Sequence, residues 1–258
     1  NLYLNQRVYA ESPLIPRAEW MACQSDDRLE DGSEIYCGLD LSKRSDLTAL
    51  VAVSAGDDDI VRSWFWKPKD MIREHERIDR VPYSVWVKEG HIDAVPGRGI
   101  EYDWVAVRLG ELAKQYRIVG IAYDRKYIDD LLSAMTRVGL EAYKDSGSGP
   151  PVGIGDGAIR MVDWGQGYVS MAPAVDALEM SVLNRKLKHD GNPCLTWNMS
   201  NAMTDMDPAG GRKFNKSKTR FRIDGAVALA MALGLKSRDM MAGYGPSVYN
   251  EREGFLTL

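Results

Sequence analysis

Short runs of apolar residues, bounded by turn-forming residues, recur along the chain and predict β-strands. The first three runs are separated only by short polar stretches that contain "SKR" and "GDDD", so we expect them to form an antiparallel meander. A later run, "RIVGIAYD", is short and rich in branched residues, which is typical of a buried strand. The predicted strands cover residues 34–42, 46–55, 60–68, 117–124 and 140–143.

Between these runs, apolar residues recur every three or four positions, a spacing that predicts helices. The stretch 103–116 places Val105, Leu109 and Leu112 on one face, with Asp103 available as the cap. A broad apolar face also predicts a helix from Ile223 onward. The predicted helices cover residues 17–23, 103–116, 126–137, 171–187 and 223–236, with short helices in 69–99 and a helix, or a strand leading into one, in 192–204.

The order of these elements predicts the fold class. Three antiparallel strands are followed by helix, strand, helix, strand and helix. Consecutive strands tend to be neighbours, and parallel crossovers are right-handed. We therefore expect an α/β fold with a mixed central sheet, three antiparallel strands and then parallel strands, flanked by helices. The stretch 145–167 is rich in Gly, Ser and Pro and is expected to be a loop without regular structure.

Composition narrows the class of protein. The 258 residues are 45% apolar and 27% charged, which is typical of a soluble globular protein with a substantial core. The longest apolar run, residues 225–235, is too short to span a bilayer, so we expect no membrane partner. Three cysteines and three histidines are scattered without metal-ligand spacing. Their distribution predicts neither a zinc site nor a disulfide framework, and it favours a reducing cytosol.

Three acidic residues occupy positions where a site can form. Asp40 ends the first predicted strand, Asp124 ends the fourth, and Asp224 lies in the first turn of the last helix. Sites in open α/β sheets form at the carboxyl ends of strands, so the three meet if the first and fourth strands are parallel neighbours. Converging carboxylates repel each other unless a cation such as Mg²⁺ or Mn²⁺ binds them. Considered alone, Asp224 is equally typical of a helix cap.

Other polar residues near these positions have two interpretations. Asp46 begins the second predicted strand, across a tight turn from Asp40, and is either a fourth ligand or an Asx-type turn residue. Arg125 and Lys126 follow Asp124 directly and either meet a phosphate or form a solvated helix start. Three further residues are expected to be structural or to lie at the surface: His189, Asp205 and Asp207.

A local run of positive charge contrasts with the net charge of −4. The sequence "RKFNKSKTRFR" carries six cations and no acid, directly before Asp224: Arg212, Lys213, Lys216, Lys218, Arg220 and Arg222. A basic run is commonly a solvated face. Two glycines before it mark a turn, so we expect a hairpin that projects beside the acids. There its cations could follow the backbone of duplex DNA without reading bases.

The segments "GLDLSKRSDLTAL", "IAYDR" and "RIDGAVALAMALG" occur in an order and at separations that resemble one family. They are similar to the nuclease domain of the tailed-bacteriophage large terminase subunit, a member of the RNase H-like superfamily. The resemblance extends over residues 20–237 and includes "VPYSVWVKEGHI" and "HDGNPCLTWNMSN". By this resemblance, Asp40, Asp124 and Asp224 are expected to hold two Mg²⁺ or Mn²⁺ ions and to catalyse DNA cleavage.

The resemblance also implies a function and a domain organisation. It implies an endonuclease that cuts double-stranded DNA with little sequence specificity during viral genome packaging, in the cytoplasm of the infected bacterium. In this family an ATPase motor precedes the nuclease, but no G-x-x-x-x-G-K-[ST] motif is present here. We therefore expect part of a longer polypeptide, with partners that include the motor, the portal and the small subunit. Residues 1–28 would be the end of the motor and its linker, 29–238 the nuclease domain, and 239–258 a tail.

Two alternatives come from other classes of protein. The stretch "GLDLSKRSDLTA" also resembles the phosphate-binding turn of actin-like and sugar-kinase ATP sites. Such sites need a second glycine-rich loop and an adenosine-binding glycine pair, and neither is clear in this sequence. In the other alternative, the acids are helix and turn caps, and the chain is a non-catalytic docking module of the packaging motor.

Overall fold

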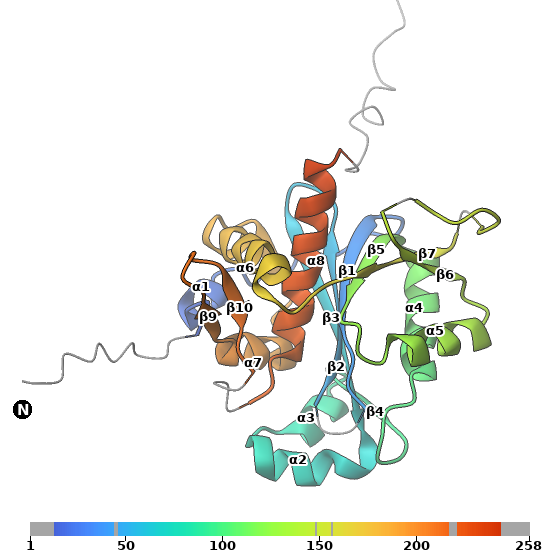
Figure 1. The fold of residues 1–258 in the computed structure, drawn as a ribbon. Helices are drawn as coiled ribbons and strands as arrows, with labels where there is room; N and C mark the ends of the chain where they lie inside the picture. Colours follow the sequence, from blue (N-terminus) through green and yellow to red (C-terminus); the bar gives the residue numbers. More distant parts are fainter. Residues whose placement is uncertain (1–12, 44–45, 148, 156, 217–220, 244–258) are drawn as a thin grey trace, which may run out of the picture.

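The computed structural model describes residues 13–43, 46–147, 149–155, 157–216 and 221–243, and it is built around one mixed sheet (Figure 1). The strand order is β4-β3-β2-β1-β5-β7-β6, and β8 pairs with β3. β2 is antiparallel to both β1 and β3, whereas β5, β7 and β6 run parallel to β1, so the predicted mixed sheet is confirmed. The strands are β1 (Glu34–Asp40), β2 (Thr48–Ser54), β3 (Asp59–Pro68), β4 (Asp93–Val95), β5 (Arg117–Tyr123), β6 (Ala142–Asp145), β7 (Ile159–Asp163) and β8 (Leu187–His189).

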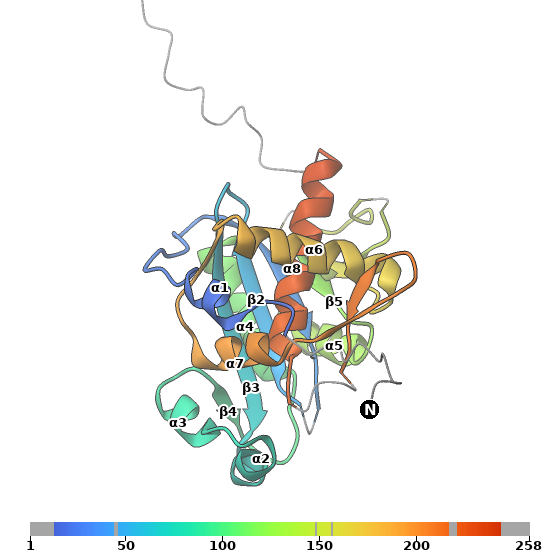
Figure 2. The ribbon, with the colours of Figure 1, turned by 90° about the vertical axis from the view of Figure 1, so that its left-hand side faces the viewer.

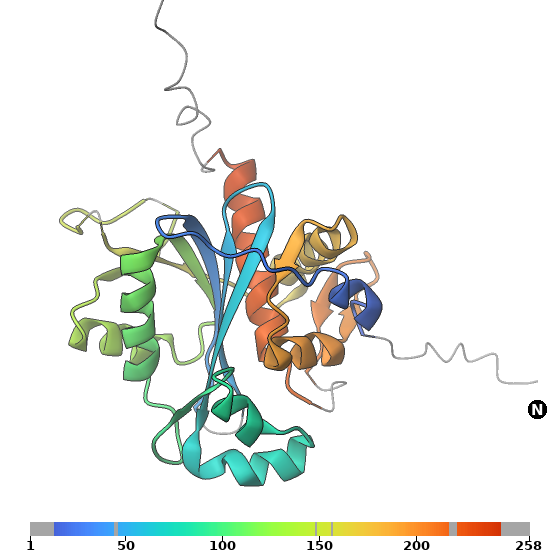
Figure 3. The ribbon, with the colours of Figure 1, turned by 180° about the vertical axis from the view of Figure 1, so that it is seen from behind.

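Helices cover both faces of this sheet. Figure 3 shows α4 and α5 on one face, and α6, α7 and α8 on the other. A small unit made of a 3₁₀ turn (Lys69–Met71), α2 and α3 follows the end of β3 and lies at one end of the sheet (Figure 1). The helices are α1 (Arg17–Met21), α2 (Ile72–Asp79), α3 (Tyr83–Lys88), α4 (Asp103–Gln115), α5 (Ile128–Arg137), α6 (Tyr168–Leu183), α7 (Pro193–Asn201) and α8 (Asp224–Met241).

Helix α8 is the centre of the larger core. Most of its residues are buried, and it packs along β1 and β2 and against α6 (Figure 2). An ideal Cβ atom added to Gly38 would lie 1.9 Å from the carbonyl oxygen of Ala228, so strand and helix are in direct backbone contact. Small residues on α8 allow this approach. Among the described residues, no helix combines the length and the apolarity needed to cross a membrane.

The basic run begins in a short hairpin. Strand β9 (Thr204–Met206) pairs antiparallel with β10 (Arg212–Phe214), and β10 packs on α6. The hairpin prediction is therefore confirmed for the first three residues of the run. Lys216 lies two residues beyond β10, whereas Lys218 and Arg220 lie outside the described residues.

Several boundaries differ from the sequence prediction. The stretch 145–167 was expected to be a loop but contains β7, which pairs with both β5 and β6. This strand has only five residues, and two of them, Arg160 and Asp163, are charged; Arg160 Nε donates to Asp145 Oδ2 at 2.7 Å. Helix α6 ends at Leu183 instead of continuing to 187. Helix α8 continues to Met241, so the first residues assigned to the tail are helical.

The described part of the N-terminal segment packs against the domain. The indole of Trp20 stacks on the His189 ring with centroids 4.0 Å apart, and its Nε1 donates to Thr196 Oγ1 at 3.1 Å. Ile15 and Cys23 are also buried in the larger core. Residues 13–28 thus form one body with the sheet. The domain boundary at residue 29 stays a prediction.

The backbone contact at Gly38 generates a stability prediction. We expect Gly38→Ala to destabilise the fold by about 3 kcal/mol or more, because the added methyl group overlaps the α8 backbone. The same change at Gly110 is the control, since nothing lies within 4 Å of a Cβ atom there and alanine favours a helix by up to about 1 kcal/mol. Urea unfolding measures the free energy of unfolding of both variants. Equal stability of the two variants would contradict the interpretation.

Candidate functional site

The three predicted acids lie at one edge of the sheet. β1 ends at Asp40, and Asp124 directly follows β5, whose Tyr123 pairs with Leu39. The two strands are parallel neighbours, as the sequence argument required. Asp224 is the first residue of α8, which packs on β1. Elements that are distant in sequence therefore converge at the carboxyl ends of two adjacent strands.

Asp40 and Asp224 share one cation. Lys216 Nζ lies 2.9 Å from Asp40 Oδ2 and 3.3 Å from Asp224 Oδ1. Asp40 is 6% exposed and Asp224 is 3% exposed, whereas the Lys216 side chain is 54% exposed. The backbone N–H of Leu47 donates to Asp224 Oδ2 at 3.2 Å. Two buried carboxylates are therefore held together by an ammonium group that reaches them from the surface.

The pKa values of Asp40, Asp224 and Lys216 reflect their burial and their mutual charges. Burial raises the pKa of Asp40 to about 7; the Lys216 charge opposes this rise, and the charges of Asp224 and Asp124 add to it. Burial also raises the pKa of Asp224, again opposed by Lys216. Burial alone would lower the pKa of Lys216, but attraction by the two carboxylates raises it above its usual range. The pair therefore favours a bound positive charge.

Asp124 and Asp46 lie beside this pair with other contacts. Asp124 is partly exposed, and its Oδ1 accepts the Lys126 backbone N–H at 3.2 Å. Asp46 forms an ion pair with Arg222, and its backbone N–H donates to Ser42 Oγ at 3.2 Å. In the described ranges, no three or more His, Cys, Asp or Glu side chains are arranged as a ready metal cluster. The structure thus pairs Asp40 and Asp224 across a cation, whereas Asp124 and Asp46 do not complete a group of three acids with them among the described residues.

All four described cations of the basic run contact the protein itself. Arg212 pairs with Asp176 and Glu179 of α6, in each case at 2.6 Å. Lys213 Nζ lies 4.6 Å from the centre of the Tyr168 ring. Lys216 and Arg222 hold carboxylates, as described above. The sequence shows where the charges are but not which acids approach them, so the DNA-binding role of this run stays a prediction.

The other polar residues that the sequence analysis considered for the site contact neighbouring groups of the protein. Arg125 pairs with Asp163 at 2.6 Å, and Lys126 Nζ lies 4.9 Å from the Tyr127 ring centre. His189 is buried beneath Trp20. Asp205 bonds to Asn215, and Asp207 Oδ1 accepts the backbone N–H groups of Ala209 and Gly211 in the β9–β10 turn.

Sequence reasoning missed the residues that fix the start of α8. Asn198 is fully buried on α7; its Oδ1 accepts the Gly225 backbone N–H at 2.8 Å, and its Nδ2 donates to the Cys194 carbonyl at 2.9 Å. A Cβ atom at Gly225 would lie 2.9 Å from the Phe65 ring. Gly225, which follows Asp224, is therefore held by Asn198 on one side and by the Phe65 ring on the other. No local pattern singles out Asn198, because α7 also carries Thr196, Ser200 and Asn201.

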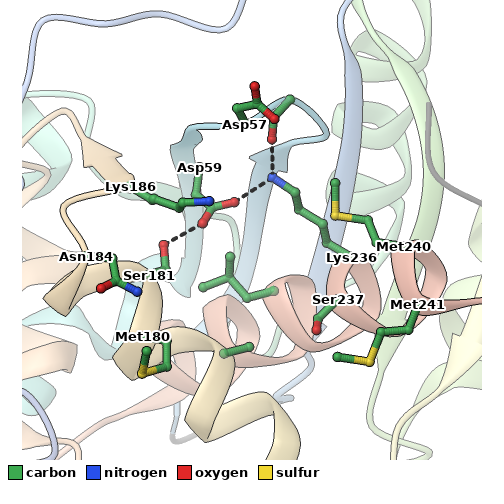
Figure 4. Close-up of a pocket in the computed structure, with 13 residues that line it drawn as sticks. Asp57, Asp59, Met180, Ser181, Asn184, Lys186, Lys236, Ser237, Met240 and Met241 are labelled. Carbon is green, nitrogen blue, oxygen red and sulfur yellow. Dashed lines mark hydrogen bonds and ion pairs between the residues drawn. The ribbon is translucent and has the colours of Figure 1, made fainter. Parts of the chain in front are cut away.

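A separate cavity of about 360 Å³ lies near the other end of α8, between that helix and α6 (Figure 4). Three of its polar residues bond one another: Lys236 Nζ lies 2.6 Å from Asp59 Oδ1, and Ser181 donates to the same carboxylate. Lys236 is twelve residues from Asp224, or roughly 18 Å along a helix. The cavity is therefore separate from the acidic edge.

Comparison with known proteins identifies the family. The chain matches the profile described as "Terminase large subunit, endonuclease domain" over residues 1–146 and 155–239. The chain belongs to this family. The terminase endonuclease family includes the large terminase subunit of Enterobacteria phage HK97, which is 38% identical over 236 aligned residues, covering 91% of this chain and 43% of that protein. The resemblance inferred from the sequence motifs is confirmed, and it favours a nuclease over an actin-like ATP site.

Further relatives show how much of a terminase this chain spans. Protein YmfN of Escherichia coli K12 is 22% identical over 247 residues, covering 90% of this chain and 50% of that protein. The chain thus spans half or less of these two relatives. The HK97 large terminase crystal structure superposes with a TM-score of 0.75 at 36% identity, covering 87% of this chain and 43% of that chain.

The fold also matches an isolated terminase nuclease. The large terminase nuclease of thermophilic phage G20c, solved with bound magnesium, has a TM-score of 0.53 at 10% identity, covering 87% of this chain and 97% of that chain. At this identity the match shows the fold alone. The predicted mixed α/β sheet flanked by helices is therefore confirmed as the fold of terminase nuclease domains.

The raised pKa of Asp40 predicts how stability depends on pH. Because this pKa rises from 3.8 to about 7 on folding, the folded chain retains a proton that the unfolded chain releases, and stability falls as pH rises between these values. In EDTA, we expect Asp40→Asn to be more stable than the parent at pH 8, by roughly 2 kcal/mol, but not at pH 4.

Urea unfolding at the two pH values measures this difference. Asp26→Asn is the matched control, since Asp26 is exposed and lies outside the acidic edge. A parent and an Asp40→Asn variant that keep the same difference at pH 4 and pH 8 would contradict the prediction.

Proposed function

We propose that this domain is a divalent-metal-dependent endonuclease that hydrolyses phosphodiester bonds of double-stranded DNA during viral genome packaging, with little sequence specificity. The observation that carries the proposal is the pair of buried carboxylates, Asp40 and Asp224, which share a cation at the carboxyl end of β1. Membership of the terminase endonuclease family supports the reaction class.

The donor set fits a hard divalent cation. Carboxylate oxygens are ligands that Mg²⁺ and Mn²⁺ prefer, and this pair already attracts an ammonium group. Asp40 and Asp224 would hold the metal together with Asp124, and Asp46 would be a further ligand. A nuclease of the same fold was solved with bound magnesium, which supports this assignment. Two bound Mg²⁺ or Mn²⁺ ions would supply an activated water and stabilisation of the leaving oxygen.

The protein's own groups would orient the reaction. Asp224 is fixed by the Leu47 N–H, and the residue after it by Asn198, so its carboxylate is preorganised. Lys216 neutralises the pair in the absence of metal and, with a half-exposed side chain, can turn toward a phosphate oxygen when a metal replaces it. The site therefore keeps a cation next to the carboxylates in either state.

DNA would be bound through its backbone. In this proposal Lys213, Lys216, Lys218 and Arg220 contact phosphates, and Arg212 would have to release its α6 acids to do so. Such contacts position a duplex without reading its sequence. The full-length protein would add an ATPase motor, the portal and the small subunit as partners, in the cytoplasm of the infected bacterium. Docking to those partners would be an additional role of the domain.

Loss of either buried acid should abolish cleavage. We expect Asp40→Asn and Asp224→Asn to reduce plasmid nicking and linearisation in Mn²⁺ by about three orders of magnitude, because bound metal supplies several kcal/mol and each 1.4 kcal/mol is about tenfold. EDTA should have the same effect on the parent, and Asp26→Asn should cut normally. Unchanged cutting by Asp40→Asn would rule out this site.

Lys216 should compete with the metal. We expect Lys216→Gln to bind Mn²⁺ about fivefold more tightly in the absence of DNA, because an ion pair of about 1 kcal/mol with a half-exposed lysine no longer has to be displaced. Isothermal calorimetry measures this affinity, and Lys114→Gln on the outer helix α4 is the control. Weaker Mn²⁺ binding by Lys216→Gln would show that the lysine supports the metal site instead.

A further inference from the structure

Arg222, expected from the sequence to bind DNA, lies between two carboxylates of the protein. Its Nη1 pairs with Asp46 Oδ1, and its Nε donates to Asp79 Oδ2 at 3.2 Å. The side chain is 23% exposed. The planar guanidinium presents donors in a fixed fork, which suits it to span two acids. In this position it does not present its charge to a DNA backbone.

Asp79 is anchored in the unit formed by α2 and α3. It is the last residue of α2, is almost fully buried, and accepts the Tyr83 hydroxyl of α3 at 2.8 Å. The Nζ of Lys67, at the end of β3, lies 4.3 Å from the centre of the Tyr83 ring. Lys67 is 0% exposed, and its Nζ has no hydrogen-bond partner in the described part of the chain. Asp79 is therefore fixed among positive groups.

Asp46 is not anchored in this way. It lies in the turn between β1 and β2 with a partly exposed side chain, and the next residue, Leu47, donates its N–H to Asp224. One guanidinium thus joins a fixed acid, Asp79, to an acid that borders the site. If Asp79 were neutral, Arg222 would be free to pair with Asp46 alone.

We propose that Asp79 is a positioning residue for the metal site: it retains the Arg222 guanidinium, so that Asp46 can leave Arg222 and serve as a metal ligand. The inference rests on the proposed function, because it assumes that Asp40 and Asp224 bind a divalent ion. It assigns Arg222 the role of controlling whether Asp46 can bind the metal, and not the role of binding DNA. It also gives the unit of α2 and α3 a role at the acidic edge, which it meets through the ion pair of Asp79 with Arg222.

The test is Mn²⁺ binding by calorimetry on the whole chain without DNA. We expect Asp79→Asn to bind Mn²⁺ about tenfold more weakly, the range usual for residues that orient metal ligands. Adding Arg222→Gln should restore binding to the parent value. In an Asp46→Asn background, Asp79→Asn should have no further effect, since the ligand that Arg222 would withhold is gone.

Controls distinguish the positioning role of Asp79 from a general effect of removing a negative charge and from a loss of folding. Glu74→Gln removes an exposed acid from α2 and should leave Mn²⁺ affinity unchanged. An Asp79→Asn effect that persists in the Asp46→Asn background would show a general charge effect and overturn the proposal. If Asp79→Asn does not fold, Arg222→Gln alone decides: Mn²⁺ binding at least as tight as in the parent supports the proposal, and tenfold weaker binding overturns it.

DNA binding by Arg222→Gln distinguishes the alternative role. We expect the dependence of log K on log salt to keep the parent slope, whereas loss of a phosphate contact would lower that slope by about 0.9 and overturn the assignment. A parent that binds no Mn²⁺ would refute the proposed function itself. A parent that binds Mn²⁺ through Asp40, with an Asp79→Asn variant that binds equally well, would refute only this inference.

Discussion

The contact between β1 and α8 at Gly38 determines where every other part of the site lies. Side chains two residues apart on a strand point to the same face, so Asp40 points to the face on which α8 packs at Gly38. Residues four apart on a helix share a face, so Asp224 lies one turn before Ala228 on the side that touches β1. One backbone contact thus makes two carboxylates face each other. Any side chain at position 38 would separate them.

Bringing these acids together creates an electrostatic cost that the protein offsets with lysine. Two buried carboxylates repel, and burial disfavours their charged forms. Lys216 reaches the pair from beyond β10, while Arg222 approaches Asp46 from the segment just before α8. The basic run therefore neutralises the acidic edge from inside the protein. This arrangement explains why a run that is dense in positive charge presents so few free cations among its described residues.

The sequence was sufficient to predict the architecture where elements were long and cleanly bounded. The β1–β3 meander and β5 each stood out as a short apolar run and α8 as a broad apolar face, and the ends of β1 and β5 located two acids of the candidate site. Strand β7 was missed because five residues within a Gly- and Pro-rich stretch carry little periodic signal, and its pairing depends on strands β5 and β6 being in place. Ion pairs such as Lys216 with Asp40 join residues far apart in the chain, so no local pattern could reveal them.

Helix α7 has a consequence for how force would pass through this domain. Its Thr196 binds the indole of Trp20 in the entering segment, and its Asn198 binds the amide that follows Asp224. The two contacts are two residues apart on one short rigid element. Tension on the chain before Trp20 would therefore act on the same helix that fixes the backbone next to Asp224. A single nine-residue helix thus connects the entering segment to the start of α8.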